Sequence, residues 1–417
     1  MPEVRYVGVS PEFEKWLEEA ALHHASMAAG DRASAMSEAI MRVGSAKLLF
    51  AIDIMGLDIG KYAVIFAPDG TFSMNRIRTK RGFSYGGLMI ADYDGYLFLH
   101  NAMPNGCGYT VAKISPDLTD EQIEQILVQA RKRLNQDVQL STGNHFAGAY
   151  YAKDPLSGED TGERYVLVHC SGHVGGAKLY DVSWLQSTPG FEEIQTPHGK
   201  VTVLTDEAKK EYLEFFDYAD KGNAKNREAY LSEIFNEGEY GIICSLTHQG
   251  LLYEGKNHRL GVQKIIQDLM PVAFNPEEGV ALLKGKRNIS PASEVFLKTF
   301  TEQEMIIDKK YVRNLNIVPH GAGYEFKDKI HKIQIGLNKE GIEKITINFA
   351  NTGTVSVPNM RSIRERITYR RKTPIMKQVA KFELAEHVFD LPYFYQIYPL
   401  KSIPGGLESK RTKQLQE

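Results

Sequence analysis

Residues 62–67 read YAVIFA and residues 87–93 read GLMIADY. Both runs are short and apolar and are flanked by Gly, Asn or Asp, which is typical of buried strands. Four later runs have the same character: YVLVHC (165–170), YGIICSL (240–246), IHKIQIGL (330–337) and KITINFA (344–350). Because strands outnumber regular strand–helix alternations, the sequence predicts an α+β fold with a mixed-sheet core and surrounding helices, rather than a doubly wound sheet.

Helices are expected in four regions: 11–43, 119–134, 206–235 and 378–390. The second is the clearest, because Thr119 and Gln122 fit a capping box ahead of a periodic apolar face. The third is predicted as one helix or two, broken or bent near Gly222.

The chain of 417 residues is 42% hydrophobic and 24% charged, the composition of a globular protein with a substantial core. It has neither repeats nor a Pro/Gly-rich boundary, so we expect one large domain over residues 1–417. A charged and frayed tail is expected over about 408–417.

The sequence predicts a protein of the cytoplasm that does not enter a membrane. No stretch approaches ~18 consecutive apolar residues, and the N-terminus carries charges where a signal peptide needs an apolar segment. Three cysteines in a long chain without such a signal indicate reduced thiols.

The net charge of −2 argues against a broad nucleic-acid-binding surface. The charge is uneven, however, because residues 361–372 read RSIRERITYRRK. Such a run can contact phosphates, although a solvated charged face is the commoner role of such a run. The candidates for RNA contact are Arg361, Arg364, Arg366, Arg370 and Arg371.

His169, His248 and His320 each stand where an expected strand ends, and Cys107 has a similar setting in MPNGCGYT. Two further histidines are candidates: His145 follows a polar stretch in STGNHFAG, and His258 lies in KNHRLG. A single histidine of this kind is more often a hydrogen-bonded structural residue, and a buried cysteine is usually a small hydrophobe. Together they form a nitrogen and sulfur donor set that suits Zn²⁺ or Mn²⁺-like ions. Without CxxC or HExxH, such a site is assembled from distant loops, which is typical of catalysis.

The order of the motifs resembles the RtcB-type RNA-splicing ligases along most of the chain. The segments that carry the resemblance are YGGLMIADYDGYLFLHNAMPNGCGYTVAKI (85–114), GNHF (143–146), VLVHCSGHVGG (166–176), KNR (225–227), CSLTHQG (244–250), NHRLGV (257–262), HGAG (320–323) and LPYFYQIYPLKSIPGG (391–406). No P-loop, GxSxG elbow or Rossmann fingerprint offers a competing interpretation.

The resemblance implies an enzyme that joins RNA ending in a 3′-phosphate or 2′,3′-cyclic phosphate to RNA with a 5′-hydroxyl. It implies GTP and Mn²⁺ as cofactors, with Zn²⁺ equally compatible with the donor types. His258 would carry GMP, while Cys107, His145, His169 and His248 would bind metal. Asn144, Phe146, His320, Gly321, Ala322, Gly323 and Lys401 would contact the nucleotide.

The chain departs from the family pattern at several positions. Pro104 stands where the family has an acidic residue three positions before its metal-binding Cys, and Arg76 to Lys80 align with another acidic segment. Gly148, Tyr324 and Pro404 replace a Glu, an Arg and a Lys of the family. Two alternatives therefore remain open: altered chemistry on RNA ends, and non-catalytic binding of metal and RNA ends. The choice between GTP and ATP is also open.

Overall fold

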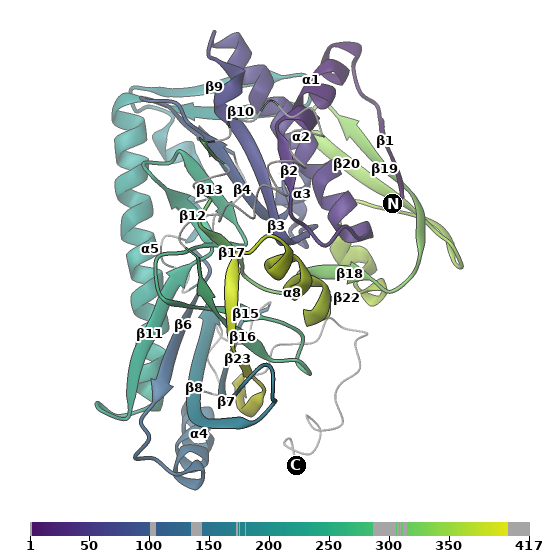
Figure 1. Ribbon diagram of the computed structural model, residues 1–417. Helices are drawn as coiled ribbons and strands as arrows, with labels where there is room; N and C mark the ends of the chain where they lie inside the picture. Colours follow the sequence, from purple (N-terminus) through teal and green to yellow (C-terminus); the bar gives the residue numbers. More distant parts are fainter. Residues whose placement is uncertain are drawn as a thin grey trace.

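The computed structural model describes residues 2–100, 106–134, 144–171, 181–286 and 315–398, together with 174, 176–179, 306, 308, 310 and 311. Helices and several mixed sheets make up these residues, so the predicted α+β class is confirmed (Figure 1). The expectation of one domain stays a prediction. Among the described helices, none is long and apolar enough to cross a membrane.

A five-stranded sheet lies in the upper half of Figure 1 and has the order β12–β13–β4–β3–β2. Its strands are β2 (His24–Ser26), β3 (Tyr62–Thr71), β4 (Tyr85–Ala91), β12 (Gln249–Leu252) and β13 (Asn257–Leu260). Helices α1 (Pro11–Leu22) and α2 (Arg32–Ile54) contribute to the main hydrophobic core together with one face of β3 and β4. Every residue of β3 is buried, including the apolar run 62–67 from which the strand was predicted.

The largest sheet occupies the lower half and has the order β11–β6–β8–β7–β23–β16–β15, with β24 also paired to β7. Its strands are β6 (Gly108–Ile114), β7 (Phe146–Lys153), β8 (Asp160–Cys170), β11 (Tyr240–Thr247), β15 (Leu269–Ala273), β16 (Val280–Gly285), β23 (Ala385–Leu391) and β24 (Tyr393–Tyr398). The sheet curls so that its two edges approach, and Ser245 near one edge donates its backbone N–H to Gln267 Oε1 near the other (3.0 Å).

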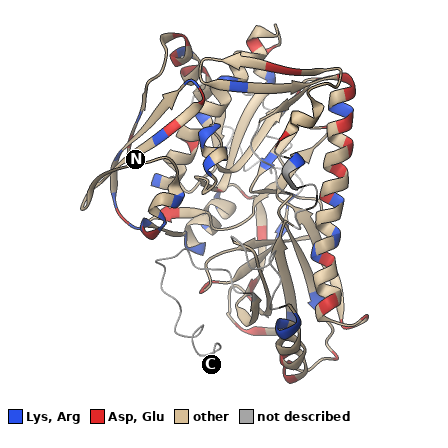
Figure 2. Cartoon of the chain, turned by 180° about the vertical axis from the view of Figure 1, so that it is seen from behind, with Lys and Arg blue, Asp and Glu red and all other residues tan. Residues whose placement is uncertain are grey.

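Helix α5 (Asp206–Ile234) runs along the side of both halves, and α4 (Asp120–Leu134) covers the far end of the large sheet. Buried residues recur along α5 every three or four positions, while Figure 2 shows charges of both signs along its outer side. The remaining strands form a sheet β1–β19–β20–β21, a sheet β5–β10–β9 and the pairs β14–β17 and β18–β22. Their bounds are β1 (Glu3–Val7), β5 (Leu97–Leu99), β9 (Phe191–Thr196), β10 (Gly199–Leu204), β14 (Val262–Lys264), β17 (Ile317–Pro319), β18 (Tyr324–Phe326), β19 (Ile330–Asn338), β20 (Gly341–Phe349), β21 (Gly353–Val357) and β22 (Ile367–Tyr369).

All six predicted strands are present, and the helix predicted over 119–134 is confirmed as α4. Its capping box forms as expected: Thr119 donates its N–H to Gln122 Oε1 at 2.8 Å, and Gln122 donates its N–H to Thr119 Oγ1 at 3.3 Å. The third predicted helix is one continuous element. Gly222 lies within this continuous helix. A Cβ there would meet the Val174 side chain at 2.7 Å, so the glycine allows the close approach of Val174.

Two helix predictions were wrong in extent. Residues 11–43 form two helices separated by β2, because the Asp31 side chain caps a new helix by accepting the N–H of Ser34 at 2.8 Å. Residues 378–390 divide between α8 (Lys372–Lys381) and β23. Helix α8 stops because Glu383 adopts a left-handed backbone with φ 49°, and Leu384 then donates its N–H to Val379 O.

The two large sheets meet end to end. Strand β3 ends at Thr71, β4 begins at Tyr85 and β13 ends at Leu260. Because these neighbouring strands are antiparallel, the three termini lie together at one end of the strands of the five-stranded sheet. In the large sheet, the strand ends that face this junction are the start of β6 at Gly108 and the end of β8 at Cys170. Side chains from distant parts of the sequence converge at this junction.

Candidate metal centre

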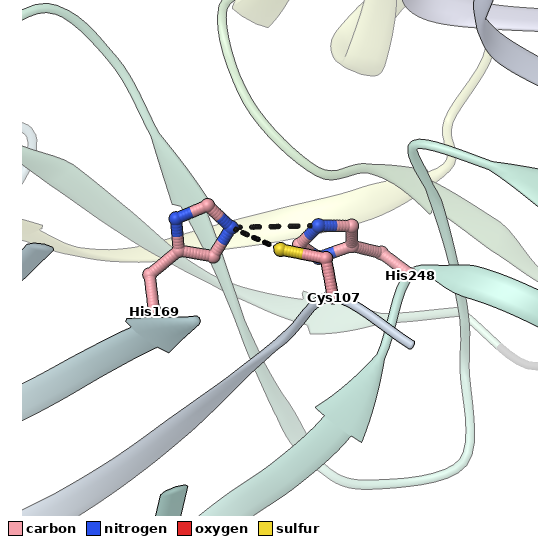
Figure 3. Close-up of side chains that lie close together, drawn as sticks. All are labelled: Cys107, His169 and His248. Carbon is pink, nitrogen blue, oxygen red and sulfur yellow. Dashed lines mark hydrogen bonds between the residues drawn. The ribbon is translucent and has the colours of Figure 1, made fainter. Parts of the chain in front are cut away.

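Three side chains converge at the junction of the sheets: Cys107, His169 and His248 (Figure 3). Their donor atoms all lie within 4.8 Å of one another, and all three residues are buried. Cys107 Sγ is 3.2 Å from His169 Nε2, which is 3.5 Å from His248 Nε2. In a tetrahedral zinc site, bonds of about 2.3 Å to sulfur and about 2.0–2.1 Å to nitrogen separate S from N by about 3.5 Å and N from N by about 3.3 Å. The group therefore fits a metal ion.

The surroundings hold the two imidazoles in the form that binds metal. His169 Nδ1 donates to the backbone oxygen of Asn144 at 3.0 Å, which leaves the lone pair of Nε2 facing Cys107 and His248. Burial lowers the pKa of both histidines well below the usual value, so both rings are neutral. Burial also raises the pKa of the Cys107 thiol to about 12, and only a bound cation would make a thiolate favourable there.

His145 stands beside this group rather than within it. Its Nε2 is 3.8 Å from Cys107 Sγ, and its ring meets that of His169 edge to face at a centroid distance of 5.6 Å. The group of donors within mutual reach does not include it. In the part of the chain described, three of the four residues predicted to bind metal lie within mutual reach, and metal binding itself stays a prediction.

His320 approaches the group from the end of β17, which pairs with β14. Its ring centroid is 4.8 Å from that of His248, and Tyr85 lies parallel to it at 6.3 Å. Its Nδ1 donates to Asp69 Oδ2 at 2.5 Å, and the same oxygen accepts the backbone N–H groups of His320 and Gly321 at 3.1 and 3.2 Å. Asp69 is wholly buried, so a fixed carboxylate orients this imidazole.

His258, the expected nucleotide carrier, lies elsewhere. In β13 it is paired with Met89, so its side chain shares the face of the sheet that packs into the core with α2. Its ring is 4.1 Å from that of His100, and burial lowers its pKa well below the usual value. The neighbouring Arg259 faces the other way and donates Nη1–H to Thr247 O. Strand alternation therefore turns His258 away from the metal-binding group.

Buried cationic side chains lie close to the metal-binding group. Arg227 of α5 is fully buried and donates Nη1–H to the backbone oxygens of Gly106 and Cys170 at 3.3 and 3.4 Å. Its guanidinium also fills the space where a Cβ at Gly108 would lie, 2.9 Å from Cζ. Arg259 is buried as well, and burial lowers the pKa of both guanidinium groups. Two buried cations beside a metal site favour an anionic ligand.

The other predicted nucleotide contacts have mixed positions. Phe146 is buried and packs against His169 at a centroid distance of 5.3 Å, so its ring forms a wall behind the metal-binding group. Asn144 is exposed. In the HGAG turn, Ala322 donates its N–H to Ala273 O at 2.8 Å, and Gly323 has φ +67° with Asp69 O 2.5 Å from its missing Cβ. Lys401 lies outside the described residues.

The basic run is only partly a surface. Arg361, Arg364 and Arg371 are exposed, whereas Arg366 lies over the ring of Phe349 at 4.6 Å. Arg370 is fully buried, which corrects its assignment to an RNA-contacting surface. It forms an ion pair with Asp31 and donates to the backbone oxygens of Asp69, Gly70 and Ala322 (2.8–3.3 Å), so it ties the HGAG turn to the end of β3.

Two residues of the site were missed from the sequence. Asp69 is a carboxylate near the end of a strand whose residues are all buried, and a buried acid needs a specific partner. Tyr109 lies in β6, two positions after Cys107, which directly precedes the strand, and this spacing puts both side chains on the same side. The Tyr109 ring is 4.5 Å from that of His169, and its hydroxyl donates to His320 O at 2.9 Å.

Comparison with known proteins identifies no family. No model of a protein family matches the chain, and no curated protein matches it.

Proposed function

We propose that this protein is a metal-dependent RNA ligase that joins a 3′-phosphate or 2′,3′-cyclic phosphate end to a 5′-hydroxyl end through a nucleotidyl-histidine. The observation that carries the proposal is His320, an imidazole beside a buried Cys–His–His group with its Nδ1 fixed by a buried carboxylate. We assign the nucleotide to His320 in place of His258, because His258 faces the core.

The arrangement suits phosphoryl chemistry. With Nδ1 protonated and bound to Asp69, the Nε2 lone pair of His320 is the free nucleophile of the ring. It attacks the α-phosphorus of GTP and pyrophosphate leaves. The ring then carries a positive charge, which the Asp69 carboxylate offsets. The pair resembles the histidine and aspartate of serine proteases in its geometry, although the imidazole here is the nucleophile rather than the base.

An oxygen of the RNA 3′-phosphate next attacks the same phosphorus, so the N–P bond breaks and His320 regains its lone pair. The 5′-hydroxyl of the second RNA then attacks the activated 3′-phosphate, loses its proton and expels GMP. A 2′,3′-cyclic end first takes up water to become a 3′-phosphate. Cys107, His169 and His248 would hold a divalent ion, which would supply Lewis acidity toward phosphate oxygens when bound. Arg227 and Arg259 add positive charge around those anionic groups.

We assign this reaction to the cytoplasm, where thiols stay reduced, since none of the three cysteines is in a disulfide and Cys107 must remain a thiolate donor. We propose GTP as the nucleotide on the resemblance of the motifs. The exposed Arg361, Arg364 and Arg371 are the proposed contacts for the RNA backbone.

The test is covalent labelling. The protein is incubated with Mn²⁺ or Zn²⁺ and GTP or ATP labelled at the α-phosphate, denatured and assayed for retained label. Label is expected in the parent protein and in His258→Ala, and is expected to be absent in His320→Ala. Label from ATP alone would show that the nucleotide is ATP rather than GTP. No label from either nucleotide, in protein shown to hold metal, would refute the ligase and favour a protein that only binds.

A further inference from the structure

The donors of the metal centre are few and of one kind. In the described part of the chain, the only group of three or more His, Cys, Asp or Glu donors within mutual reach is Cys107, His169 and His248. A second ion bridged through the thiolate would have His145 Nε2, 3.8 Å from Cys107 Sγ, as a further ligand, and no third donor of the described residues lies within mutual reach of these two. Two protein donors hold a divalent ion poorly in comparison with three. The centre is therefore built for one tightly bound ion.

The chemistry of the donors also selects among metals. Carboxylate and water oxygens suit Mn²⁺, whereas thiolate and imidazole suit Zn²⁺. No carboxylate belongs to the group, and Asp69 already accepts three N–H bonds through one oxygen. The sequence just before the cysteine, NAMPNG (101–106), contains no acidic residue either.

The charges around the centre also favour one bound ion over two. One thiolate and two neutral imidazoles contribute a single negative charge against the two charges of a divalent ion. Arg227 and Arg259 are both buried nearby, and the backbone oxygens of Gly106 and Cys170 already engage Arg227. A second dication here would add two more positive charges in a medium of low dielectric constant with no carboxylate ligand to offset them.

We infer that the centre binds one zinc-type ion through Cys107, His169 and His248, with a fourth position left open, rather than the Mn²⁺ that the family resemblance implies. Three protein ligands and an open position are the arrangement of catalytic rather than structural zinc sites. This inference concerns the metal alone. It uses the same centre as the proposed function, but metal analysis and covalent labelling fail independently of one another.

The experiment measures stoichiometry and coordination in the full chain. Protein stripped with a chelator is titrated with Zn²⁺, Mn²⁺ and Co²⁺, and bound metal is counted after gel filtration. We expect one Zn²⁺ or Co²⁺ per chain. The Co²⁺ form should show intense visible bands of four-coordinate cobalt together with a thiolate-to-cobalt charge-transfer band. Because all divalent sites favour Zn²⁺ over Mn²⁺ to some degree, the count and the spectrum decide, rather than affinity order alone.

The matched variants are Cys107→Ala and Cys244→Ala, both at buried cysteines. Cys107→Ala should lose the charge-transfer band and weaken metal binding by at least about 100-fold, judged against the about 10–100-fold typical of outer-shell changes. Cys244→Ala should keep both the band and the affinity, and far-ultraviolet circular dichroism checks the fold of each. Two Mn²⁺ ions per chain, or a weak six-coordinate cobalt spectrum without the charge-transfer band, would overturn the inference.

Discussion

Asp69→Asn isolates the carboxylate from the shape of its side chain. Asp69 Oδ2 accepts three hydrogen bonds, from His320 Nδ1 at 2.5 Å and from the backbone N–H groups of His320 and Gly321 at 3.1 and 3.2 Å. The Asn amide has nearly the same shape and keeps one oxygen that can accept hydrogen bonds. What is lost is the negative charge that faces the imidazole when it becomes cationic on taking up the nucleotide.

A hydrogen bond that involves a charged group contributes about 1.5–3 kcal/mol. Since about 1.4 kcal/mol corresponds to a tenfold change in rate, nucleotide attachment should slow by about 10- to 150-fold. Metal content should stay unchanged, because Asp69 is not among the metal donors.

The assay is the time course of covalent label from α-labelled GTP, with bound metal measured on the same preparations. Asp94→Asn is the matched control, since Asp94 is almost fully exposed and pairs with Lys256 at the surface. That variant should label at the parent rate. Parent-like labelling in Asp69→Asn would show that the carboxylate does not support His320. Loss of metal together with label would instead make Asp69 part of the metal centre.

Three further predictions concern the surroundings of the site. Arg370→Ala should lower the free energy of unfolding by about 3–5 kcal/mol in urea titrations, because it leaves buried partners unpaired, whereas the exposed Arg371→Ala should change it by less than about 0.5 kcal/mol. Burial lowers the pKa of Lys47 to about 7, so the unfolded chain binds the extra proton between pH 7 and pH 10.5 and stability should rise with pH across that window; Lys47→Met should be more stable at pH 7, by at most about 5 kcal/mol, and should lose this dependence. Gly261→Ala should abolish labelling and retain metal, because its Cβ would lie 2.7 Å from His320 Cε1 at a φ of +73°; normal labelling in that variant would show that the ring can move without loss of function.

The strands were predictable because a short apolar run indicates a buried strand, and all six predicted runs are strands. Helix ends were less predictable. The break between α1 and α2 depends on the Asp31 cap, and the end of α8 depends on the left-handed backbone of Glu383. Both are local details within a sequence whose composition is otherwise compatible with helix. The sequence also could not show which arginines of the basic run are exposed, since no pattern distinguishes the buried Arg370 from the exposed Arg371 next to it.

The sequence identified some residues of the candidate site and not others. Recurrent histidines at strand ends identified Cys107, His169 and His248 as neighbours, because strand ends that share an edge bring their turns together. Asp69 could not be placed from spacing, since its partner His320 lies 251 positions away and on a different strand pair. Only the pairing of the sheets brings the two together.

The contrast between His258 and His320 shows what a motif leaves undetermined. Both histidines occur close to a glycine, His258 in NHRLGV and His320 in HGAG. In a strand, however, successive side chains point to opposite faces of the sheet. A shift of one position therefore moves a side chain from the hydrophobic core to the candidate site, or the reverse. The pairing of His258 with Met89 turns its ring toward the core, where it meets His100. His320 instead follows the end of β17, where its backbone and ring are both fixed by one buried carboxylate. If nucleotide attachment follows His320, register and not motif decides which histidine of this chain is the nucleophile.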